Sequence, residues 1–341
     1  MATVAGIDEL EEDAANPDHF PEYLAEIKTK SIQVIRGDQL TALERAEAGR
    51  NLSLLGDGRQ EVLDSARMAF CKIPQGAFCL GEGDEGHECK ELDYDYWLSM
   101  YPVTVSQFRQ FSDAGGYGEK RYWPQAVQAE FWKEGKVKLR YDQDWRKSMP
   151  NLPNRFNYMN HPMVMISWFE GLAYCRWLTE RFHRGEVVAK DLEGLDLQSW
   201  QVTLPSEAEW EKGARGCKDK RLYPFEHEIA PNLANYRETG IESTSAVGCF
   251  AGGASPYGCL DMAGNVWEWC RNTLEKYPYK RDDREDVSKN VGSFRVFRGG
   301  SWYGPAVRCR CSCRRRRNPG RRDVHLGFRV VLVPSSLSPA G

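Results

Sequence analysis

Apolar residues in most of this chain come in short runs separated by glycine and proline, and this pattern restricts the folds available to it. From Met68 onward, runs such as MAFCKI and GAFCL are bounded by turn residues, and residues 68–83 predict a β-hairpin. Residues 120–162, rich in Trp, Tyr and Asn, predict a long surface loop of the kind that often carries function. Short strands, few helices and Gly-rich loops together predict an irregular α+β domain.

Two longer segments, 96–116 and 161–182, each predict a strand that leads into an amphipathic helix. Apolar residues recur there at three- and four-residue intervals, which places them on one face of a helix. The side chains expected to point inward are Val105, Phe108 and Phe111 in the first helix, and Leu172, Cys175 and Trp177 in the second.

Residues 1–66 differ from the rest and predict a helical N-terminal appendage. The run LTALERAEAGRNLSLLG places Leu40, Leu43, Ala46 and Ala48 near helical spacing, and the glycines at its end stop the helix. Because its charge is high and its apolar stripe is narrow, we expect this appendage to brace the main domain and to be dispensable for its fold. The main domain is expected at residues 67–334, with a short tail at 335–341.

Composition narrows the class of protein. The 341 residues carry a net charge of −3, which by itself gives no reason to expect nucleic acid or a membrane as partner. There is no run of about 18 apolar residues, and the acidic start MATVAGIDELEEDAANPDHF does not resemble a secretory signal. We therefore expect a cytoplasmic location, with most of the 11 cysteines reduced and buried.

Two tryptophan-containing blocks have a clear structural interpretation. In LPSEAEWEKGARG, Ser206 and Glu209 have the spacing of a helix capping box, so a helix should begin there with Trp210 facing the core. In DMAGNVWEWC, a Gly-Asn turn precedes Trp267 and Trp269, which alternate onto one face of a strand. Both blocks are expected to belong to the core.

Seven blocks along residues 68–333 carry a family resemblance. They are, in order, IPQGAFCLG, YPVTVSQFRQF, HPMVMISWFEGLAYCRWL, LPSEAEWEKGARG, YGCLDMAGNVWEWC, RVFRGGSW and LGFRVV. In content and order they resemble the formylglycine-generating enzyme (sulfatase-modifying factor) family. The resemblance implies a C-type-lectin-like fold with little regular secondary structure.

The same resemblance implies a structural calcium site in the block DMAGNVWEWC. The family's ligands there fall on the side chains of Asp261 and Glu268 and on the backbone carbonyls of Gly264 and Val266. Carboxylates and carbonyls are the oxygen ligands that Ca²⁺ prefers. The alternative is that Glu268 only accepts hydrogen bonds from the turn.

The family's catalytic cysteine pair is incomplete in this chain. The enzymes hold copper between two cysteines five residues apart, and these positions are Gly304 and Cys309 here. A single thiolate cannot provide the two-coordinate Cu(I) site, so no copper is expected. The arginines around Cys309 predict a lowered pKa and a thiolate, but this does not restore the reaction.

Residues 303–325 have an unusual composition, with eight Arg and no Lys, Glu, Gln, Met or Trp. Codons of the form NNY, which arise when adenines of Asn codons are altered, cannot encode the five missing types. This pattern resembles the variable proteins of diversity-generating retroelements, which rewrite surface codons on a C-type-lectin-like scaffold. The positions interpreted as variable are Tyr303, Gly304, Val307, Arg308, Cys313, Arg315, Arg317, Asn318, Arg321, Val324 and His325.

Within a variable region of about 298–331, the frame and the variable positions should behave differently. The frame is expected to be intolerant of change at Arg298, Gly299, Gly300, Trp302, Phe328 and Arg329. The variable side chains expected to be exposed and close together are Tyr303, Arg308, Arg315, Arg317, Arg321 and His325.

Three functions follow as hypotheses. The first is a catalytically inactive relative that binds a macromolecular or cell-surface ligand through its diversified C-terminal surface. The second is a copper- and oxygen-dependent oxidase that converts a cysteine of a sulfatase-like substrate to formylglycine. The third is a polyanion or nucleic-acid binder that uses the Arg cluster, which would give a steep dependence of affinity on salt. Nucleic acid is disfavoured because no aromatic platform interleaves these arginines.

Overall fold

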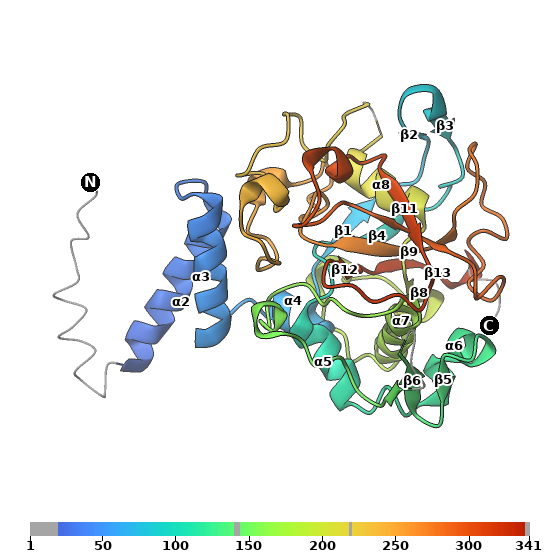
Figure 1. Ribbon diagram of the computed structural model, residues 1–341, viewed down its shortest axis with the longest axis horizontal. Coiled ribbons are helices and arrows are strands. Elements are labelled where there is room, and N and C mark those ends of the chain that lie inside the picture. The colour runs from blue at the N-terminus through green and yellow to red at the C-terminus, as the bar shows by residue number, and fades with distance from the viewer. Residues whose placement is uncertain (1–19, 140–143, 218–219, 338–341) are drawn as a thin grey trace.

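The computed structural model describes residues 20–139, 144–217 and 220–337 (Figure 1). The helices are α2 (Phe20–Arg36), α3 (Ala42–Leu55), α4 (Gln60–Leu63), α5 (Val105–Asp113), α6 (Pro124–Gln128), α7 (Trp168–His183) and α8 (Glu207–Arg215). The strands are β1 (Phe70–Ile73), β2 (Phe78–Leu80), β3 (His87–Cys89), β4 (Tyr96–Ser99), β5 (Trp132–Lys133), β6 (Lys136–Lys138), β7 (Trp145–Arg146), β8 (Trp200–Thr203), β9 (Trp267–Thr273), β10 (Arg295–Arg298), β11 (Arg314–Arg317), β12 (Leu326–Gly327) and β13 (Val331–Pro334). Within the described ranges, no helix is long and apolar enough to cross a membrane.

Two four-stranded sheets organise the main domain. In the first, the order is β1-β4-β13-β8, so the last strand of the chain lies between two earlier ones. In the second, the order is β11-β10-β9-β12, with β12 parallel to β9 and the other pairs antiparallel. Long irregular segments connect these short strands, and the predicted α+β class with little regular secondary structure is confirmed.

The predicted helices have the predicted inner faces. Helix α5 begins at a capping box formed by Thr104 and Gln107, and helix α7 at one formed by Ser167 and Glu170. The six side chains expected to point inward from the two helices are all buried. Together with Phe328, which contacts both helices through aromatic edges, they belong to the largest apolar cluster of the domain.

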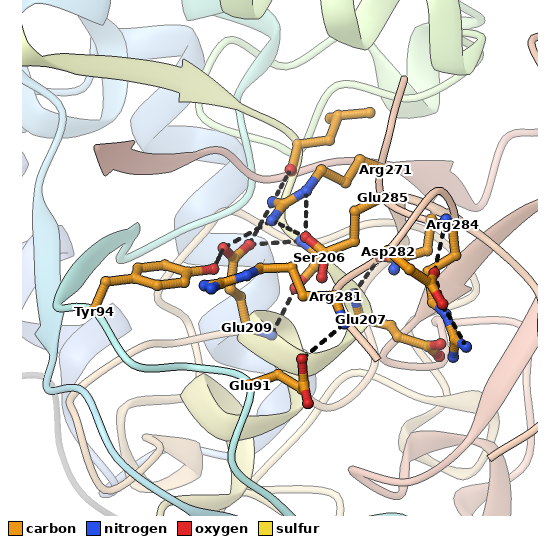
Figure 2. A network of polar contacts seen from close by, with 12 residues as sticks. Glu91, Tyr94, Ser206, Glu207, Glu209, Arg271, Arg281, Asp282, Arg284 and Glu285 are labelled. Atoms are coloured by element: carbon orange, nitrogen blue, oxygen red, sulfur yellow. Dashed lines mark hydrogen bonds and ion pairs between the residues drawn. The ribbon is translucent and has the colours of Figure 1, made fainter. Parts of the chain in front are cut away.

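A buried ionic network ties helix α8 to the second sheet (Figure 2). The capping box of Ser206 and Glu209 is present, as predicted, and Trp210 is fully buried. The Glu209 carboxylate accepts from the Arg271 guanidinium of β9 at 2.6 Å and from the Tyr94 hydroxyl at 2.5 Å. Arg271 also pairs with Glu285, so helix, strand and the following loop are fixed to one another.

Three predictions of local structure are wrong because their hydrogen bonds go to distant segments. Residues 68–83 do not form one hairpin: β1 pairs with β4, and β2 pairs with β3. Residues 161–167 form only an isolated bridge, since the backbone at Met165 is left-handed. The expected surface loop 120–162 contains α6 and three short strands, and side chains such as Trp123 lie in the core.

The N-terminal helices form a pair at one side of the molecule (Figure 1). Helix α3 ends before Gly56, as predicted. Of the expected apolar stripe, Ala46 is buried and Ala48 packs on an apolar cluster, but Leu40 and Leu43 are exposed. The face that docks on the main domain is instead made of Ala42, Arg45, Ala46, Gly49 and Leu52. Small residues permit a close approach, because a Cβ at Gly49 would lie 2.7 Å from the Cβ of Ala246.

Residues 57–66 are hydrogen-bonded to the main domain through buried groups. Arg59 and Asp57 form a buried ion pair at 2.7 Å, and Arg59 donates to the Val247 carbonyl at 2.8 Å. The carbonyl of Val62 accepts from the Thr104 hydroxyl at the start of α5. On these contacts we propose a boundary of the appendage nearer residue 56 than residue 66.

Deletion of residues 1–56 is expected to leave a folded main domain with a lowered melting temperature, because α3 covers only one small apolar cluster around Phe250. Deletion of residues 1–66 should cost much more, since it removes the buried partners of Thr104 and Val247. Thermal melting followed by near-ultraviolet circular dichroism compares the two truncations. An unfolded protein after the shorter deletion would contradict the expectation.

Candidate binding surface

Strand β11 sorts its four arginines onto two sides of the sheet, as side chains alternate along a strand. Arg314 pairs with the buried carboxylate of Glu207 at 2.6 Å, and Arg316 lies over the ring of Phe294. Arg315 and Arg317 are on the opposite side, where both line a small pocket. These two belong to the predicted variable set, whereas the residues that alternate with them do not.

The pocket has an apolar floor and a basic rim, and its volume is about 110 Å³. Trp267, Phe297 and Leu326 of three neighbouring strands form the floor, and Trp267 meets Phe297 edge to face at 5.0 Å. The polar lining residues are Arg308, Arg315, Arg317, Asp323 and His325. Residues from β11, the 3-10 turn Ala306–Cys309 and the segment before β12 therefore converge on one site.

The pocket carries an excess of positive charge. Its one acid, Asp323, accepts two hydrogen bonds from Arg321, at 2.8 and 2.6 Å. Among the residues that the structure describes, Arg308, Arg315 and Arg317 have no carboxylate within ion-pair distance. Burial lowers the pKa of His325; the nearby guanidiniums add to this effect and Asp323 opposes it. This lowered pKa favours the neutral imidazole of His325, so the positive charge of the pocket resides on the arginines.

Two exposed side chains, Tyr303 and Val307, lie beside the pocket and form what we call its shoulder. Tyr303 is 58% exposed and its ring stacks on His325, with ring centres 6.0 Å apart. Arg237 also lies over this ring, 5.8 Å from its centre, and donates to the Tyr303 carbonyl. Val307 is 53% exposed on the same 3-10 turn as Arg308. Tyr303 thus offers a rigid contact surface next to a charged hollow.

The structure brings most of the predicted binding residues together, but not all in the predicted way. Arg308, Arg321 and His325 are half-buried rather than exposed. Five predicted positions lie outside the pocket lining and the shoulder: Gly304, Cys313, Asn318, Arg321 and Val324. Among them, Cys313 and Val324 pack against the main apolar cluster, and Asn318 accepts from the backbone N–H of Gly320.

Position 304 nevertheless lies next to residues of the site. Gly304 is buried, and its carbonyl accepts from the Arg237 backbone N–H. A Cβ placed on it would lie 3.5 Å from Cδ of Arg308, which is ordinary van der Waals contact. A Cβ at position 304 would therefore fit and would contact the Arg308 side chain.

Sequence reasoning assigned Trp267 to the core and did not assign Phe297 or Asp323 to any site. The signal for Asp323 was its place between two predicted variable stretches, next to Arg321 and Arg322. The signal for Phe297 was weaker, because a buried aromatic residue in a strand is normally core. Only the pairing of β10 with β9 and β11 puts its ring beneath the arginines.

The frame of this region is built as the sequence predicts. Trp302 and Phe328 are buried, and Gly299 and Gly300 have φ values of +100° and +76°, which L side chains rarely adopt. A Cβ at Gly300 would also lie 2.6 Å from Sγ of Cys309. Arg298 and Arg329 are fully buried and paired with glutamates.

Cys309 does not have the predicted reactivity. Its side chain is completely buried, and burial raises the pKa of its thiol. The expected lowering by neighbouring arginines is wrong because burial dominates, and because Arg310 is paired with Glu82 and Arg308 lines the pocket. The thiol therefore stays protonated, and position 304 supplies no second sulfur.

The predicted calcium ligands lie in one turn, but the carboxylate of Glu268 is already engaged. It accepts from Arg329 at 2.6 and 2.8 Å and from the Trp210 indole at 2.6 Å. Asp261 accepts from the Gly248 backbone N–H at 2.7 Å and from Asn265. The described residues contain no group of three or more acidic, His or Cys side chains arranged for a metal. In this geometry the donor set does not fit Ca²⁺, because Glu268 would have to leave Arg329 first.

Calcium at this turn stays a prediction, and chelation tests it. If Asp261, Gly264, Val266 and Glu268 hold a structural ion, EDTA should lower the melting temperature of the purified protein, and calcium alone should restore it. Asp261→Asn should then remove the response to EDTA. An identical melting temperature with and without chelator would exclude a tightly held ion and leave Arg329 as the partner of Glu268.

The fold and the ordered blocks define a class, and comparison with known proteins agrees. Residues 60–333 match the family described as "Sulfatase-modifying factor enzyme 1-like domain". The chain belongs to this family. The formylglycine-generating enzyme of Thermomonospora curvata is 30% identical over 321 residues, covering 77% of this chain and 92% of that protein.

Other similar proteins extend the comparison. The serine/threonine-protein kinase pkn1 of Chlamydia pneumoniae is 29% identical over 254 residues, and this chain spans about a third (35%) of its length. Among solved structures, Treponema denticola variable protein 1 has a TM-score of 0.52 at 22% identity, covering 78% of this chain and 95% of that one. The last similarity supports the fold.

Proposed function

We propose that this protein binds a ligand through the surface formed by Tyr303, Val307, Arg308, Arg315, Arg317 and His325, and that these positions are diversified at the level of the gene. The observation that carries the proposal is that six of the eleven NNY-compatible positions meet at one pocket and its shoulder. Frame residues around them are buried and ion-paired, so the surface can change while the core does not.

Codon usage tests the diversification directly. At the six surface positions the codons should end in a pyrimidine, and a nearby reverse-transcriptase gene should accompany an imperfect repeat of this stretch. The frame arginines Arg314 and Arg316 serve as the internal control, because they need not follow the NNY pattern. Arg codons ending in a purine at positions 308, 315 and 317 would contradict the proposal.

Binding itself is tested with an array of glycans and peptides. The wild-type protein is compared with Tyr303→Ala and with Phe294→Ala, which removes an aromatic side chain of similar exposure (50%) from the other side of β11. The proposal expects Tyr303→Ala to lose the wild-type binding profile and Phe294→Ala to keep it, since exposed Tyr side chains concentrate binding energy. An unchanged profile for Tyr303→Ala would count against this surface.

An oxidase remains the second candidate, and membership of a family that contains formylglycine-generating enzymes favours it. Gly304 and the protonated, buried thiol of Cys309 argue against copper binding. Copper(I) titration of the wild-type protein and of Gly304→Cys, with a sulfatase-derived peptide, distinguishes the two. Stoichiometric copper and formylglycine product in the wild type would replace the binding proposal with catalysis.

A polyanion binder is a weaker third candidate. The arginines that are adjacent in sequence do not form one patch, because Arg314 and Arg322 are ion-paired to the buried acids Glu207 and Glu170. Affinity for a polyanion that falls steeply with salt would support it.

A further inference from the structure

Three guanidinium groups share one small hollow, and among the described residues none of the three is paired with a carboxylate. Arg315 and Arg317 reach it from alternate positions of β11, and Arg308 from the 3-10 turn facing it. Within the described part of the chain, the one acid of the pocket, Asp323, is already bonded to Arg321. The three positively charged guanidinium groups repel one another. An anion bound between them would offset this repulsion.

The size of the hollow limits what can enter it. Its volume is about 110 Å³, and one water molecule occupies about 30 Å³ in the liquid. There is room for a group the size of a few water molecules, such as a carboxylate, sulfate or phosphate. A larger part of the ligand can lie outside the hollow, where Tyr303 and Val307 are exposed.

The lining suits an oxyanion better than an apolar group. The planar guanidinium presents paired donors that match the oxygens of carboxylate, sulfate and phosphate. Arg317 also lies over the Phe297 ring at 5.8 Å, which orients its guanidinium beside the pocket floor. The aromatic floor of Trp267 and Phe297 contributes low polarity, which strengthens charge interactions in the hollow.

We propose that this pocket receives an oxyanionic group at the tip of the ligand, held by Arg308, Arg315 and Arg317, while the rest of the ligand lies against Tyr303 and Val307. The inference rests on the proposed binding function and adds the chemical class of the ligand. The variant of the surface carried by this chain is therefore selective for acidic ligands.

The pKa of the His325 imidazole can report anion binding in the pocket. If the arginines had only a structural role, adding an anion would leave this pKa unchanged. Its ring faces Arg308, Arg317 and Arg321, Asp323 and the stacked ring of Tyr303. An anion bound to the arginines offsets their repulsion of a protonated imidazole, so binding should raise the pKa of His325. Nuclear magnetic resonance of the imidazole measures that pKa, and the Arg Nε–H signals follow binding.

The experiment titrates the full-length protein with sodium sulfate, phosphate and acetate, in separate arms, at constant ionic strength set by chloride. Arg315→Gln/Arg317→Gln is the test variant and Arg316→Gln is the matched control, since Arg316 lies on the same strand but on its other side. We expect a saturable shift in the wild type, affinity weakened by about tenfold or more in the double variant, and no weakening in Arg316→Gln. The arm with the highest affinity identifies the group as carboxylate or tetrahedral oxyanion.

Two results would overturn the inference: no saturable response to any of the three anions, or the same response in the wild type and the double variant. Neither result affects the codon test or the Tyr303→Ala array, so the proposed function could survive while the oxyanion pocket is rejected. The opposite combination is also distinguishable. If the pocket binds an anion but the Arg codons end in a purine, the diversification is rejected and the oxyanion pocket is retained.

Discussion

Replacement of Arg298 with methionine is expected to lower the free energy of unfolding by about 3–5 kcal/mol, the usual cost of breaking a buried ion pair from one side. Arg298 is fully buried and contacts Glu207 at 3.1 Å and Glu211 at 2.9 Å, both also fully buried. It also donates to the Cys311 carbonyl at 3.0 Å. Methionine fills much of the space of the arginine side chain. It removes a positive charge that two buried carboxylates, those of Glu207 and Glu211, use as a partner.

Urea denaturation of Arg298→Met and of Arg316→Met measures the difference. Arg316 is exposed on the adjacent strand, so its replacement should change stability by no more than about 0.5 kcal/mol. Equal midpoints for the two variants would show that Glu207 and Glu211 are satisfied by their other partners, Arg314 and Arg215.

Phe328→Ala is the second large effect, with an expected loss of about 3–5 kcal/mol. Phe328 is fully buried, and its ring meets Phe108 of α5 and Tyr174 of α7 edge to face at 6.1 and 5.5 Å. Truncation leaves a cavity between two helices whose own capping fixes them in place, so the site has little freedom to collapse.

The control for this variant is Phe294→Ala, which removes a ring that is 50% exposed. The same urea titration should show a small change for Phe294→Ala and a large fall in the midpoint for Phe328→Ala. A loss below about 1 kcal/mol for Phe328→Ala would mean that the helices close over the gap, contrary to the behaviour of well-packed cores.

Sequence alone predicted the elements whose stabilising contacts are local. The capping box of Ser206 and Glu209 and the buried face of α5 depend on residues three or four positions apart, and both are present. The 68–83 hairpin was wrong because β1 and β2 take strands from elsewhere as partners. Leu43 was misplaced because what docks α3 is the close approach at Gly49, for which small residues matter more than large apolar ones.

The candidate site was predictable as a set of positions but not as a shape. Composition singled out residues 303–325, and the two-residue spacing of Arg315 and Arg317 already agreed with one side of a strand. The half-burial of Arg308 and the floor provided by Phe297 depend on how a 3-10 turn and strand β10 pack, which no local pattern encodes. The thiol of Cys309 was misjudged for the same reason, since neighbours in sequence are not its neighbours in space.

Strand β11 forms an outer edge of its sheet, and four arginines occupy it. An open edge is a template on which strands of other copies can add, and charged side chains are one of the means by which proteins prevent this. If positions 315 and 317 changed to tyrosine, valine or isoleucine, the edge would become attractive to other strands. Arg316, outside the variable set and exposed, would keep a positive charge on that edge in every variant, so we expect the lineage to remain free of strand-mediated aggregation whichever ligand it comes to recognise.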